Sequence, residues 1–307
     1  MKVLFMGTPE FASVCLSALI NSAHEVVGVV TQPDRALKRG KTEQSPVKSA
    51  AVKAGIEVIQ PEKIREHADE LKRFGADIAV TAAYGQLLTQ SVLDAFPRGV
   101  INVHASLLPK YRGASPIQAA IANGETETGV TIMQTELGLD SGDILASVKV
   151  PIASSDDAGS LTDKLAAAGS RLLVQTLDGF DGITPVKQDG AAATHCRTIK
   201  KNELFIDFGK SARDVVNQIR SLSPAPGAKT EIGGEIYKIY EAVDFGQAFT
   251  NAEPGEIVEC GKRLVIACGE GSIEIKSIQA PSKRRLSIAE FLRGKRFDIG
   301  VKCGILQ

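Results

Sequence analysis

Cysteine is scarce in this sequence, and its spacing excludes two common kinds of site. The 307 residues include five cysteines, and no CxxC pair occurs among them. An odd number of widely spaced cysteines argues against a disulfide framework, and the missing metal-ligand spacing argues against a zinc site. The sequence therefore predicts reduced thiols and no bound metal.

The sequence also lacks an excess of charge of either sign and a long apolar run. Lys and Arg total 36, as do Asp and Glu, so the net charge is zero. A chain that binds nucleic acid through its overall charge is usually basic, so any polyanion site must be a local patch. No segment reaches the roughly 18 apolar residues of a membrane span, and the apolar start is too short for a signal peptide. We expect a cytoplasmic protein that acts as a monomer.

Apolar runs alternate with helical patterns in the N-terminal half. The runs predict strands near residues 2–6, 25–31, 56–61, 76–85 and 99–106. Helices are predicted between them, the first with Thr8 as N-cap and Pro9 as its first residue. Strands that alternate with helices form a parallel sheet with right-handed crossovers. This half is therefore predicted to be an α/β domain with a Rossmann-like parallel sheet.

The turn after the first predicted strand lacks the glycine fingerprint of dinucleotide sites. It reads Gly7-Thr8-Pro9-Glu10 in place of GxGxxG, and Pro9 has no N–H to offer a pyrophosphate. The sequence therefore disfavours a nicotinamide-dependent dehydrogenase.

The texture of the sequence changes after residue 184. Residues 185–203 are polar and without period, which predicts a linker, and a helix is expected over 211–222. Several short strands follow between glycine-rich turns, which is typical of a small barrel, and we predict an OB-like fold. At roughly 150 residues per domain the length fits two domains. We expect a catalytic domain at 1–184, a linker at 185–203 and an OB-like domain at 204–307.

Two polar side chains end the last of the predicted parallel strands. Asn102 and His104 are two residues apart, so they project from the same face of the strand, near the edge where parallel sheets bind ligands. An amide donor beside an imidazole suits a reaction that develops an oxyanion and moves a proton. The alternative is that both are satisfied polar residues at a strand end. Of the four histidines, His104 alone lies in an apolar strand pattern, which favours the catalytic interpretation.

A second polar pair lies downstream, in a loop after the stretch that begins at residue 129. Asp140 and Asp143 flank a Ser-Gly turn. A carboxylate there could face the imidazole, favour its protonated form and fix its orientation. It could equally cap its own turn, and the spacing does not decide between the two roles.

These residues form a pattern that resembles the formyltransferase family that uses 10-formyltetrahydrofolate. The pattern is Asn-x-His, then Ser-Leu-Leu-Pro, then an Asp about 36 residues past the His, and it is matched by Asn102, His104, Ser106–Pro109 and Asp140. Stretches such as "FMGTPEFA", "AAYGQLL" and "RGASPIQ" extend the likeness, which covers the whole chain. One departure is that the 31–48 loop has no Pro after Arg35.

The resemblance implies formyl transfer from 10-formyltetrahydrofolate without a metal. The catalytic residues would be Asn102, His104 and Asp140. The co-substrate would contact the loops that contain Leu88 and Leu137, and a wall made by Ser106, Leu107, Leu108 and Pro109.

The resemblance further implies initiator methionyl-tRNA as the partner that supplies the acceptor amine. Two basic segments fit phosphate contact: the 31–48 loop, and residues 283–298 with six basic against two acidic side chains. The implied tRNA contacts are Arg39, Lys41, Lys283, Arg284 and Arg285. The alternatives are a sugar-nucleotide amine or glycinamide ribonucleotide as acceptor, and an RNA-binding module without catalysis. A small acceptor would need neither basic segment, and a module without catalysis would not need Asn102, His104 and Asp140.

Overall fold

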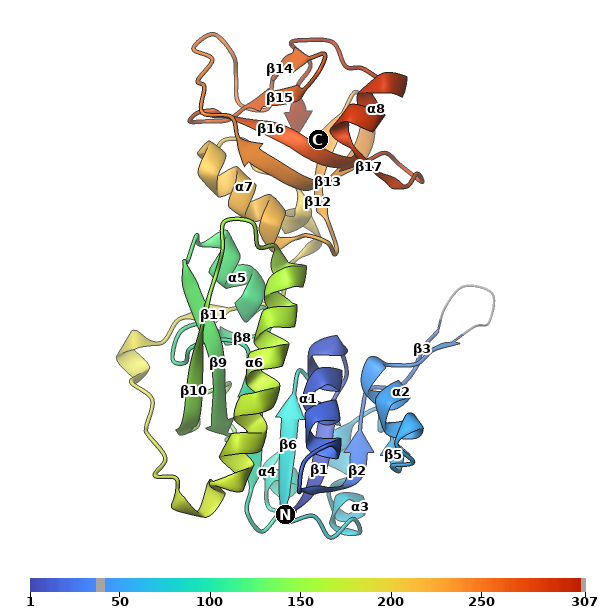
Figure 1. Ribbon diagram of the computed structural model, residues 1–307, viewed down its shortest axis with the longest axis vertical. Coiled ribbons are helices and arrows are strands. Elements are labelled where there is room, and N and C mark those ends of the chain that lie inside the picture. Colours follow the sequence, from blue (N-terminus) through green and yellow to red (C-terminus); the bar gives the residue numbers. More distant parts are fainter. Residues whose placement is uncertain (37–41, 305–307) are drawn as a thin grey trace. The chain divides into compact units, whose positions relative to one another are not determined.

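The chain packs into two compact units. A computed structural model describes residues 1–36 and 42–304 (Figure 1). Unit 1 comprises residues 1–116, 127–151 and 162–196, and unit 2 comprises 117–126, 152–161 and 197–307. Arg39 and Lys41, two of the predicted tRNA contacts, lie outside the described residues.

The core of unit 1 is a seven-stranded sheet with the order β10-β9-β7-β6-β1-β2-β5. Its strands are β1 (Lys2–Gly7), β2 (Glu25–Val30), β5 (Val58–Ile59), β6 (Ile78–Ala82), β7 (Val100–His104), β9 (Glu127–Gln134) and β10 (Ile144–Pro151). The strands from β7 to β5 run parallel, as predicted. At the other edge β9 runs antiparallel to β7 and β10 antiparallel to β9. The short 135–143 connection explains the second reversal, because a parallel crossover needs a dozen or more residues.

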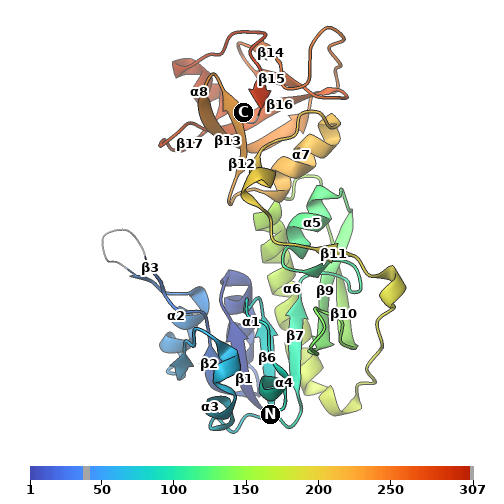
Figure 2. The same ribbon diagram turned by 180° about the vertical axis from the view of Figure 1, so that it is seen from behind.

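Helices cover both faces of this sheet. They are α1 (Glu10–Ile20), α2 (Pro46–Lys53), α3 (Ala68–Lys72), α4 (Gln90–Leu93) and α6 (Ala158–Asp178). Helix α5 (Pro116–Ala122) belongs mostly to unit 2. Leu4 and Met6 of β1 pack with Leu71 of α3 and Val92 of α4. Figure 1 shows α1 and α6 in front of the strands, and Figure 2 shows the sheet from behind.

The start of α1 lies one residue later than the sequence predicted. Pro9 is the N-cap, with extended backbone, and Glu10 is the first helical residue. The hydroxyl of Thr8 donates instead to the carbonyl of Tyr84, at 3.3 Å. Gly7 is required at this turn, because a Cβ there would lie 2.9 Å from the carbonyl oxygen of Ala82 and 2.7 Å from Ala12 Cβ. The first strand therefore passes directly against β6.

Unit 2 is built on a curled antiparallel sheet, in agreement with the predicted OB-like architecture. Its order is β14-β15-β16-β13-β12-β18, with β17 paired to β16. The strands are β12 (Ala228–Ile232), β13 (Glu235–Asp244), β14 (Ile257–Cys260), β15 (Leu264–Ala267), β16 (Ser272–Gln279), β17 (Arg285–Ser287) and β18 (Cys303–Gly304). The β13–β16 ladder shifts register on both sides of Glu241, and such bulges bend a strand and increase its twist.

Two helices pack against the sheet of unit 2. Helix α7 (Ala212–Ser221) begins at Ser211, whose hydroxyl accepts the N–H of Asp214, and α8 (Ile288–Gly294) begins with a capping box between Ser287 and Glu290. Tyr237 is fully buried and meets the rings of α8 residue Phe291 and of Phe297 edge-on, at 6.1 and 5.5 Å.

Short elements complete the described part of the chain. They are the strand pairs β3 (Arg35–Ala36) with β4 (Thr42–Glu43) and β8 (Arg112–Gly113) with β11 (His195–Cys196), and the 3-10 turns η2 (Ile64–Glu66), η3 (Phe180–Gly182), η4 (Gly190–Ala192) and η5 (Lys201–Leu204). Within residues 1–36 and 42–304, no helix has both the length and the apolar character that crossing a lipid bilayer requires.

Candidate active site

Strand β7 carries the first two candidate catalytic residues. Val103 packs toward Gly169 of α6, so its neighbours Asn102 and His104 project from the opposite face of the strand. The hydroxyl of Thr81, on the adjacent strand β6, donates to Asn102 Oδ1 at 2.8 Å. Because the oxygen of the amide is engaged in this way, the NH₂ group of Asn102 lies on the other side as a donor.

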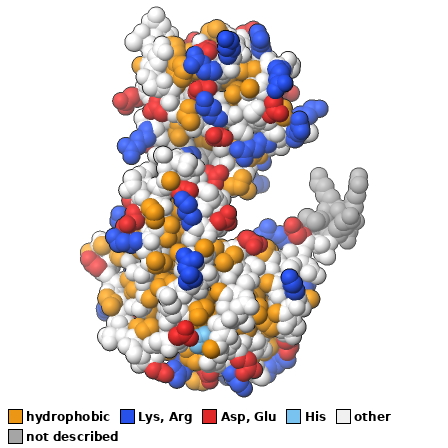
Figure 3. Space-filling view, in the orientation of Figure 1, with side chains coloured by type: hydrophobic (Ala, Val, Ile, Leu, Met, Phe, Trp, Pro, Cys, Tyr) orange, Lys and Arg blue, Asp and Glu red, His pale blue; other side chains and the backbone are white. Residues whose placement is uncertain are grey.

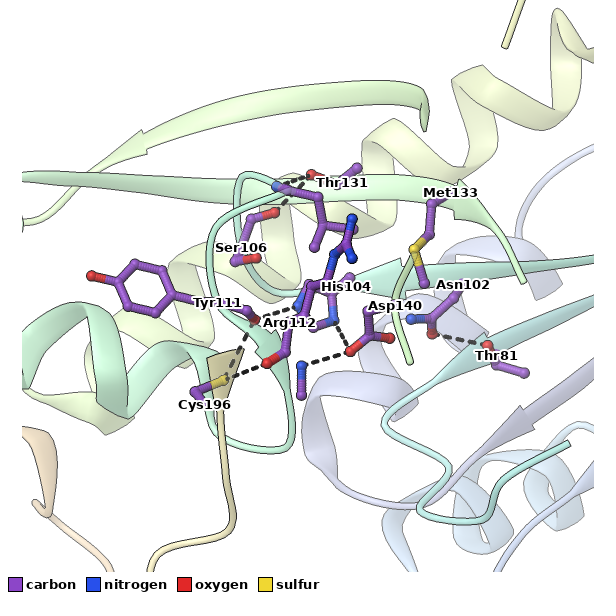
Figure 4. Close-up of polar contacts among 12 residues, drawn as sticks. Thr81, Asn102, His104, Ser106, Tyr111, Arg112, Thr131, Met133, Asp140 and Cys196 are labelled. Atoms are coloured by element: carbon purple, nitrogen blue, oxygen red, sulfur yellow. Dashed lines mark hydrogen bonds and ion pairs between the residues drawn. The ribbon is translucent and has the colours of Figure 1, made fainter. Parts of the chain in front are cut away.

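The imidazole of His104 is buried and held at one nitrogen. Its Nε2 lies 2.9 Å from the carbonyl oxygen of Tyr111 (Figure 4). A carbonyl oxygen only accepts, so Nε2 carries a hydrogen in this arrangement. The other nitrogen, Nδ1, is therefore the ring atom that can gain or lose a proton. It faces Asp140 Oδ2 at 3.6 Å, with side-chain exposures of 6% for His104 and 14% for Asp140.

The carboxylate of Asp140 reaches across to a distant segment and does not cap its own turn. Its Oδ2 accepts the main-chain N–H of Gly113 at 2.7 Å. The backbone of Asp140 is left-handed, with φ of 48°, a conformation that only a few residue types tolerate. Asp143 instead closes the loop through its main-chain carbonyl, which accepts the N–H of Gln134 at 2.9 Å. Of the two aspartates, Asp140 is the one that faces His104.

The segment that supplies these main-chain partners is itself held from the other side. Tyr111 directly precedes β8, Gly113 ends it, and β8 pairs in parallel with β11. The N–H of Tyr111 donates to the hydroxyl of Thr194 at 2.8 Å. Gly113 has φ of 116°, and a Cβ there would lie 2.1 Å from the carbonyl oxygen of Cys196. The close approach of the two strands thus depends on glycine at this position.

Residues 186–196, called the strap segment here, belong to the part of the chain that the sequence predicted as a linker. The strap segment contains β11, which pairs with β8. Its Val186 also exchanges two main-chain hydrogen bonds of 2.8 Å with Ile144 of β10. The strap segment therefore packs along unit 1 and supports the loops around His104 and Asp140.

The thiol of Cys196 lies beside the site without the character of a nucleophile. Burial raises its pKa, and the charge of Asp140 acts in the same direction. Its Sγ lies 3.4 Å from the carbonyl oxygens of Tyr111 and Arg112. A thiol that stays protonated and donates to carbonyls has a structural role. All five cysteines are free, as the sequence predicted.

The Ser106–Pro109 turn, predicted to contact the co-substrate, is tightly bonded within the protein. The hydroxyl of Ser106, which is fully buried, donates to the carbonyl of Lys110 at 2.6 Å. Thr131 Oγ1 donates to the carbonyl of Ser106 at 2.7 Å and accepts the N–H of Leu108 at 3.1 Å. Leu108 is buried, and Leu107 packs over Gly129. These contacts fix the path of the chain from His104 to Tyr111.

An open hollow of about 610 Å³ lies beside the loop that carries Asp140. Its lining includes Leu137, which is 66% exposed, and Phe96. Leu88 is half-buried and packs against the core of unit 1. Of the two predicted leucine contacts, Leu137 therefore presents an apolar side chain at the hollow.

The predicted tRNA contacts in unit 2 are exposed. Lys283 and Arg284 lie in the turn between β16 and β17. The guanidinium of Arg285 stacks over the ring of Tyr240 at 4.7 Å. Unit 2 also contains a hollow, of about 650 Å³, whose lining includes the basic side chains of Arg293 and Arg296. Figure 3 shows Lys and Arg side chains spread over the visible face of unit 2, together with Asp and Glu.

Several contributors to the site carried no signal in the sequence. Thr81, the carbonyl of Tyr111 and the N–H of Gly113 hold the catalytic candidates, and Gln188 of the strap segment bonds the Asp140 loop. A sequence identifies side chains and does not show which main-chain atoms will form contacts. The strap segment also has no hydrophobic periodicity that would predict its structure. Within the described residues, no cluster of His, Cys, Asp and Glu could hold a metal ion.

Comparison with known proteins defines the class. The family described as formyl transferase matches residues 1–177, and the one described as formyl transferase, C-terminal domain, matches residues 198–296. Among solved structures, the N-formyltransferase of Helicobacter canadensis in complex with folinic acid and dTDP-3-aminofucose superposes with a TM-score of 0.70 at 21% identity, covering 92% of this chain and 100% of that one. The fold is therefore that of a formyl transferase.

Sequence relatives narrow the class. The methionyl-tRNA formyltransferase of Lachnospira eligens is 44% identical over 315 residues, which span 99% of this chain and all 100% of that protein. The methionyl-tRNA formyltransferase of Chromobacterium violaceum is 43% identical over 310 residues, with the same shares of 99% and 100%. The chain belongs to the methionyl-tRNA formyltransferases, a family of enzymes that transfer a formyl group, and the family predicted from the sequence is confirmed.

Proposed function

We propose that this enzyme transfers the formyl group of 10-formyltetrahydrofolate to the α-amine of methionine on initiator methionyl-tRNA, and so prepares the tRNA for translation initiation. The names of the relatives support this acceptor. The observation that carries the chemistry is the arrangement of His104, with Nε2 on the carbonyl of Tyr111 and Nδ1 facing Asp140.

The proposed reaction proceeds by addition and elimination. The lone pair of the α-amine attacks the formyl carbon, a C–N bond forms, and the formyl oxygen becomes negative. The NH₂ group of Asn102 and the protonated Nδ1 of His104 stabilise that oxygen, and one such donor typically contributes about 3 kcal/mol. The amine then loses a proton, the bond to N10 breaks, and N10 gains a proton. In this step Nδ1 of His104 donates its proton to N10 and then accepts the proton that the amine loses, and Asp140 stabilises the charged ring directly or through one water.

The folate co-substrate is proposed to bind beside the Asp140 loop. The exposed side chain of Leu137 offers an apolar contact for the flat pterin ring. Leu88 and the turn formed by Ser106, Leu107, Leu108 and Pro109 are proposed to shape the walls of this site. The rigid hydrogen bonding of that turn supports such a role, because a fixed wall orients a ligand without losing entropy on binding.

The tRNA is proposed to bind through local basic patches. Lys283, Arg284 and Arg285 would contact phosphates from the 204–307 domain, and Arg39 and Lys41 would do so from the 31–48 loop. We further propose that the 1–184 domain carries out the chemistry and that 185–203 links the two domains. The monomeric state and the cytoplasmic location stay predictions.

A direct assay tests the proposed function. The protein is mixed with 10-formyltetrahydrofolate and methionine-charged initiator tRNA, and formyl-methionine is quantified after release from the tRNA. Uncharged tRNA is the control for the acceptor. A sugar-nucleotide amine and glycinamide ribonucleotide are assayed in parallel. Faster formylation of either small amine than of the charged tRNA would overturn the proposed acceptor.

A further inference from the structure

Gln188, in the strap segment, is buried at the back of the Asp140 loop. Its side chain is 8% exposed. The amide nitrogen Nε2 donates to the carbonyl oxygen of Asp140 at 2.9 Å and to that of Gly142 at 2.7 Å. The amide oxygen Oε1 accepts from Arg112 Nε at 3.1 Å and Nη2 at 2.8 Å. One side chain thus connects the strap segment, the Asp140 loop and β8.

These four hydrogen bonds permit one orientation of the amide. Turned over, the oxygen would face two carbonyl oxygens and the NH₂ group would face a guanidinium, which only donates. Both amide hydrogens are used, and the buried oxygen accepts a forked pair from an arginine. Burial strengthens such bonds and makes the loss of one partner costly.

The loop that Gln188 holds needs external support. Asp140 has left-handed backbone, and its neighbours Leu137 and Leu139 are 66% and 52% exposed, so the loop buries little apolar surface of its own. The carboxylate is tied at its front by the N–H of Gly113. The main chain is tied at its back by Gln188. Arg112, the other partner of Gln188, directly precedes Gly113. The side chain of Gln188 therefore supports both the Gly113 side and the Asp140 side of the hydrogen bond between these two residues.

We propose that Gln188 is a positioning residue for formyl transfer, which rests on the proposed function. It fixes the Asp140 loop against β8, and so holds the Asp140 carboxylate opposite Nδ1 of His104. It touches neither substrate nor the reacting atoms. A misplacement of about 1 Å in a catalytic geometry can cost on the order of 100-fold in rate. We therefore expect the loss of Gln188 to lower kcat because it displaces the carboxylate of Asp140.

The test compares Gln188→Met with a matched control. Methionine keeps the length of the side chain and removes both donors and the acceptor. Gln175→Met, on the exposed face of α6, makes the same chemical change away from the loop. We expect Gln188→Met to lower kcat by roughly 10- to 100-fold with little change in KM for 10-formyltetrahydrofolate. The control keeps the kcat of the parent. A folded Gln188→Met enzyme with the parental kcat overturns the proposal.

A double-mutant cycle separates positioning from general structural damage. If Gln188 acts through Asp140, then Gln188→Met added to Asp140→Asn lowers kcat by little beyond Asp140→Asn alone. Full multiplication of the two losses overturns the proposal, since it means that Gln188 acts elsewhere. If His104→Ala and Asp140→Asn each retain the parental kcat, the proposed chemistry itself fails, and this outcome is distinct from a parental kcat in Gln188→Met alone.

A second variant covers the case in which Gln188→Met does not fold. Gln188→Glu keeps the acceptor for Arg112 and replaces the NH₂ group with an oxygen that faces two carbonyl oxygens. Protonation of the new carboxyl restores one donor. We therefore expect its kcat, relative to the parent at each pH, to rise as the pH falls. A ratio that stays flat across the pH range contradicts the donor role of Gln188.

Discussion

The hydroxyl of Thr81 on β6 donates to the amide oxygen of Asn102 on β7, and this bond orients the amide so that its NH₂ group faces away from Thr81. Thr81 is 7% exposed, so few alternative partners can replace it. The donor that we propose for the formyl oxygen therefore depends on a neighbouring strand. The relationship gives the first of five predictions.

Thr81→Val should lower kcat by about 10-fold, because a free amide rotates and presents its donor for only part of the time. Valine has the shape of threonine, so packing between the strands is retained. The matched control is Thr176→Val, which removes a buried hydroxyl that donates within α6 to the carbonyl of Leu172. Steady-state formylation kinetics check the expectation, and equal kcat in both variants would leave Thr81 without an orienting role.

His104→Ala should lower kcat by about 10² to 10⁴, the usual contribution of a positioned acid-base group. The binding of 10-formyltetrahydrofolate, measured by calorimetry, should change little. His67→Ala is the control, because His67 is a half-exposed histidine paired with Glu70 on the surface. Parental turnover in a folded His104→Ala enzyme would remove the imidazole from the mechanism.

Asp140→Asn should lower kcat by on the order of 100-fold, because the amide keeps an oxygen for the N–H of Gly113 but removes the charge opposite His104. Asp143→Asn, three residues along the same loop, is the control and should keep the parental kcat, because Asp143 closes the loop through its main-chain carbonyl, which the substitution leaves in place. Both values come from single-turnover assays. The reverse ranking would assign the catalytic carboxylate to Asp143.

Replacing Lys283 and Arg284 together by alanine should weaken binding of the tRNA and leave folate binding unchanged. Each lost phosphate contact should make the dependence of log affinity on log salt shallower by about 0.7–0.9. Lys72→Ala is the control, since that lysine is paired with Asp69 in α3. Filter binding over a salt series measures the slope, and an unchanged slope would exclude this turn from the tRNA interface.

The base of the 31–48 loop should respond to acid. The side-chain hydrogen bond from Lys48, followed by that from Gln60, lowers the pKa of Asp34 below its usual 3.8. A lowered pKa in the folded state stabilises the protein above the unfolded value, and the gain is lost as the pH falls through the folded value. The Tm of the parent should therefore exceed that of Asp34→Asn near neutral pH, and the difference should vanish in strong acid. A difference that persists there would mean that the stabilisation does not come from the charge.

Much of the fold can be predicted from the sequence, because apolar runs and helical periodicity are patterns of side chains. The parallel strands and the curled sheet of unit 2 followed from such patterns. The two-residue period of a strand also predicts that Asn102 and His104 share one face. The antiparallel edge at β9 and β10 was not predicted, because strand direction depends on how the connection runs and not on the pattern within the strand.

The remainder of the site depends on groups that a sequence does not display. The carbonyl of Tyr111 and the N–H of Gly113 are main-chain atoms, and only the folded path brings them to His104 and Asp140. Spacing left the role of Asp140 undecided, because an aspartate in a loop can cap its own turn. Gln188 lies in a polar, aperiodic segment, and its role appears only when its four hydrogen bonds are traced.

The late position of the strap segment in the chain has a consequence for synthesis. Strand β10 ends at Pro151 and α6 ends at Asp178. When the ribosome has released the chain as far as the end of α6, all seven strands of the unit 1 sheet have therefore emerged, together with Asn102 and His104 of β7. At that stage β8 has no partner, and the Asp140 loop has no bond at its back, because β11 and Gln188 come later. The nascent chain can thus form the sheet of unit 1 first. The contacts that hold β8 and the Asp140 loop form only after the strap segment has been translated, as expected for a unit that folds from its N-terminus onward.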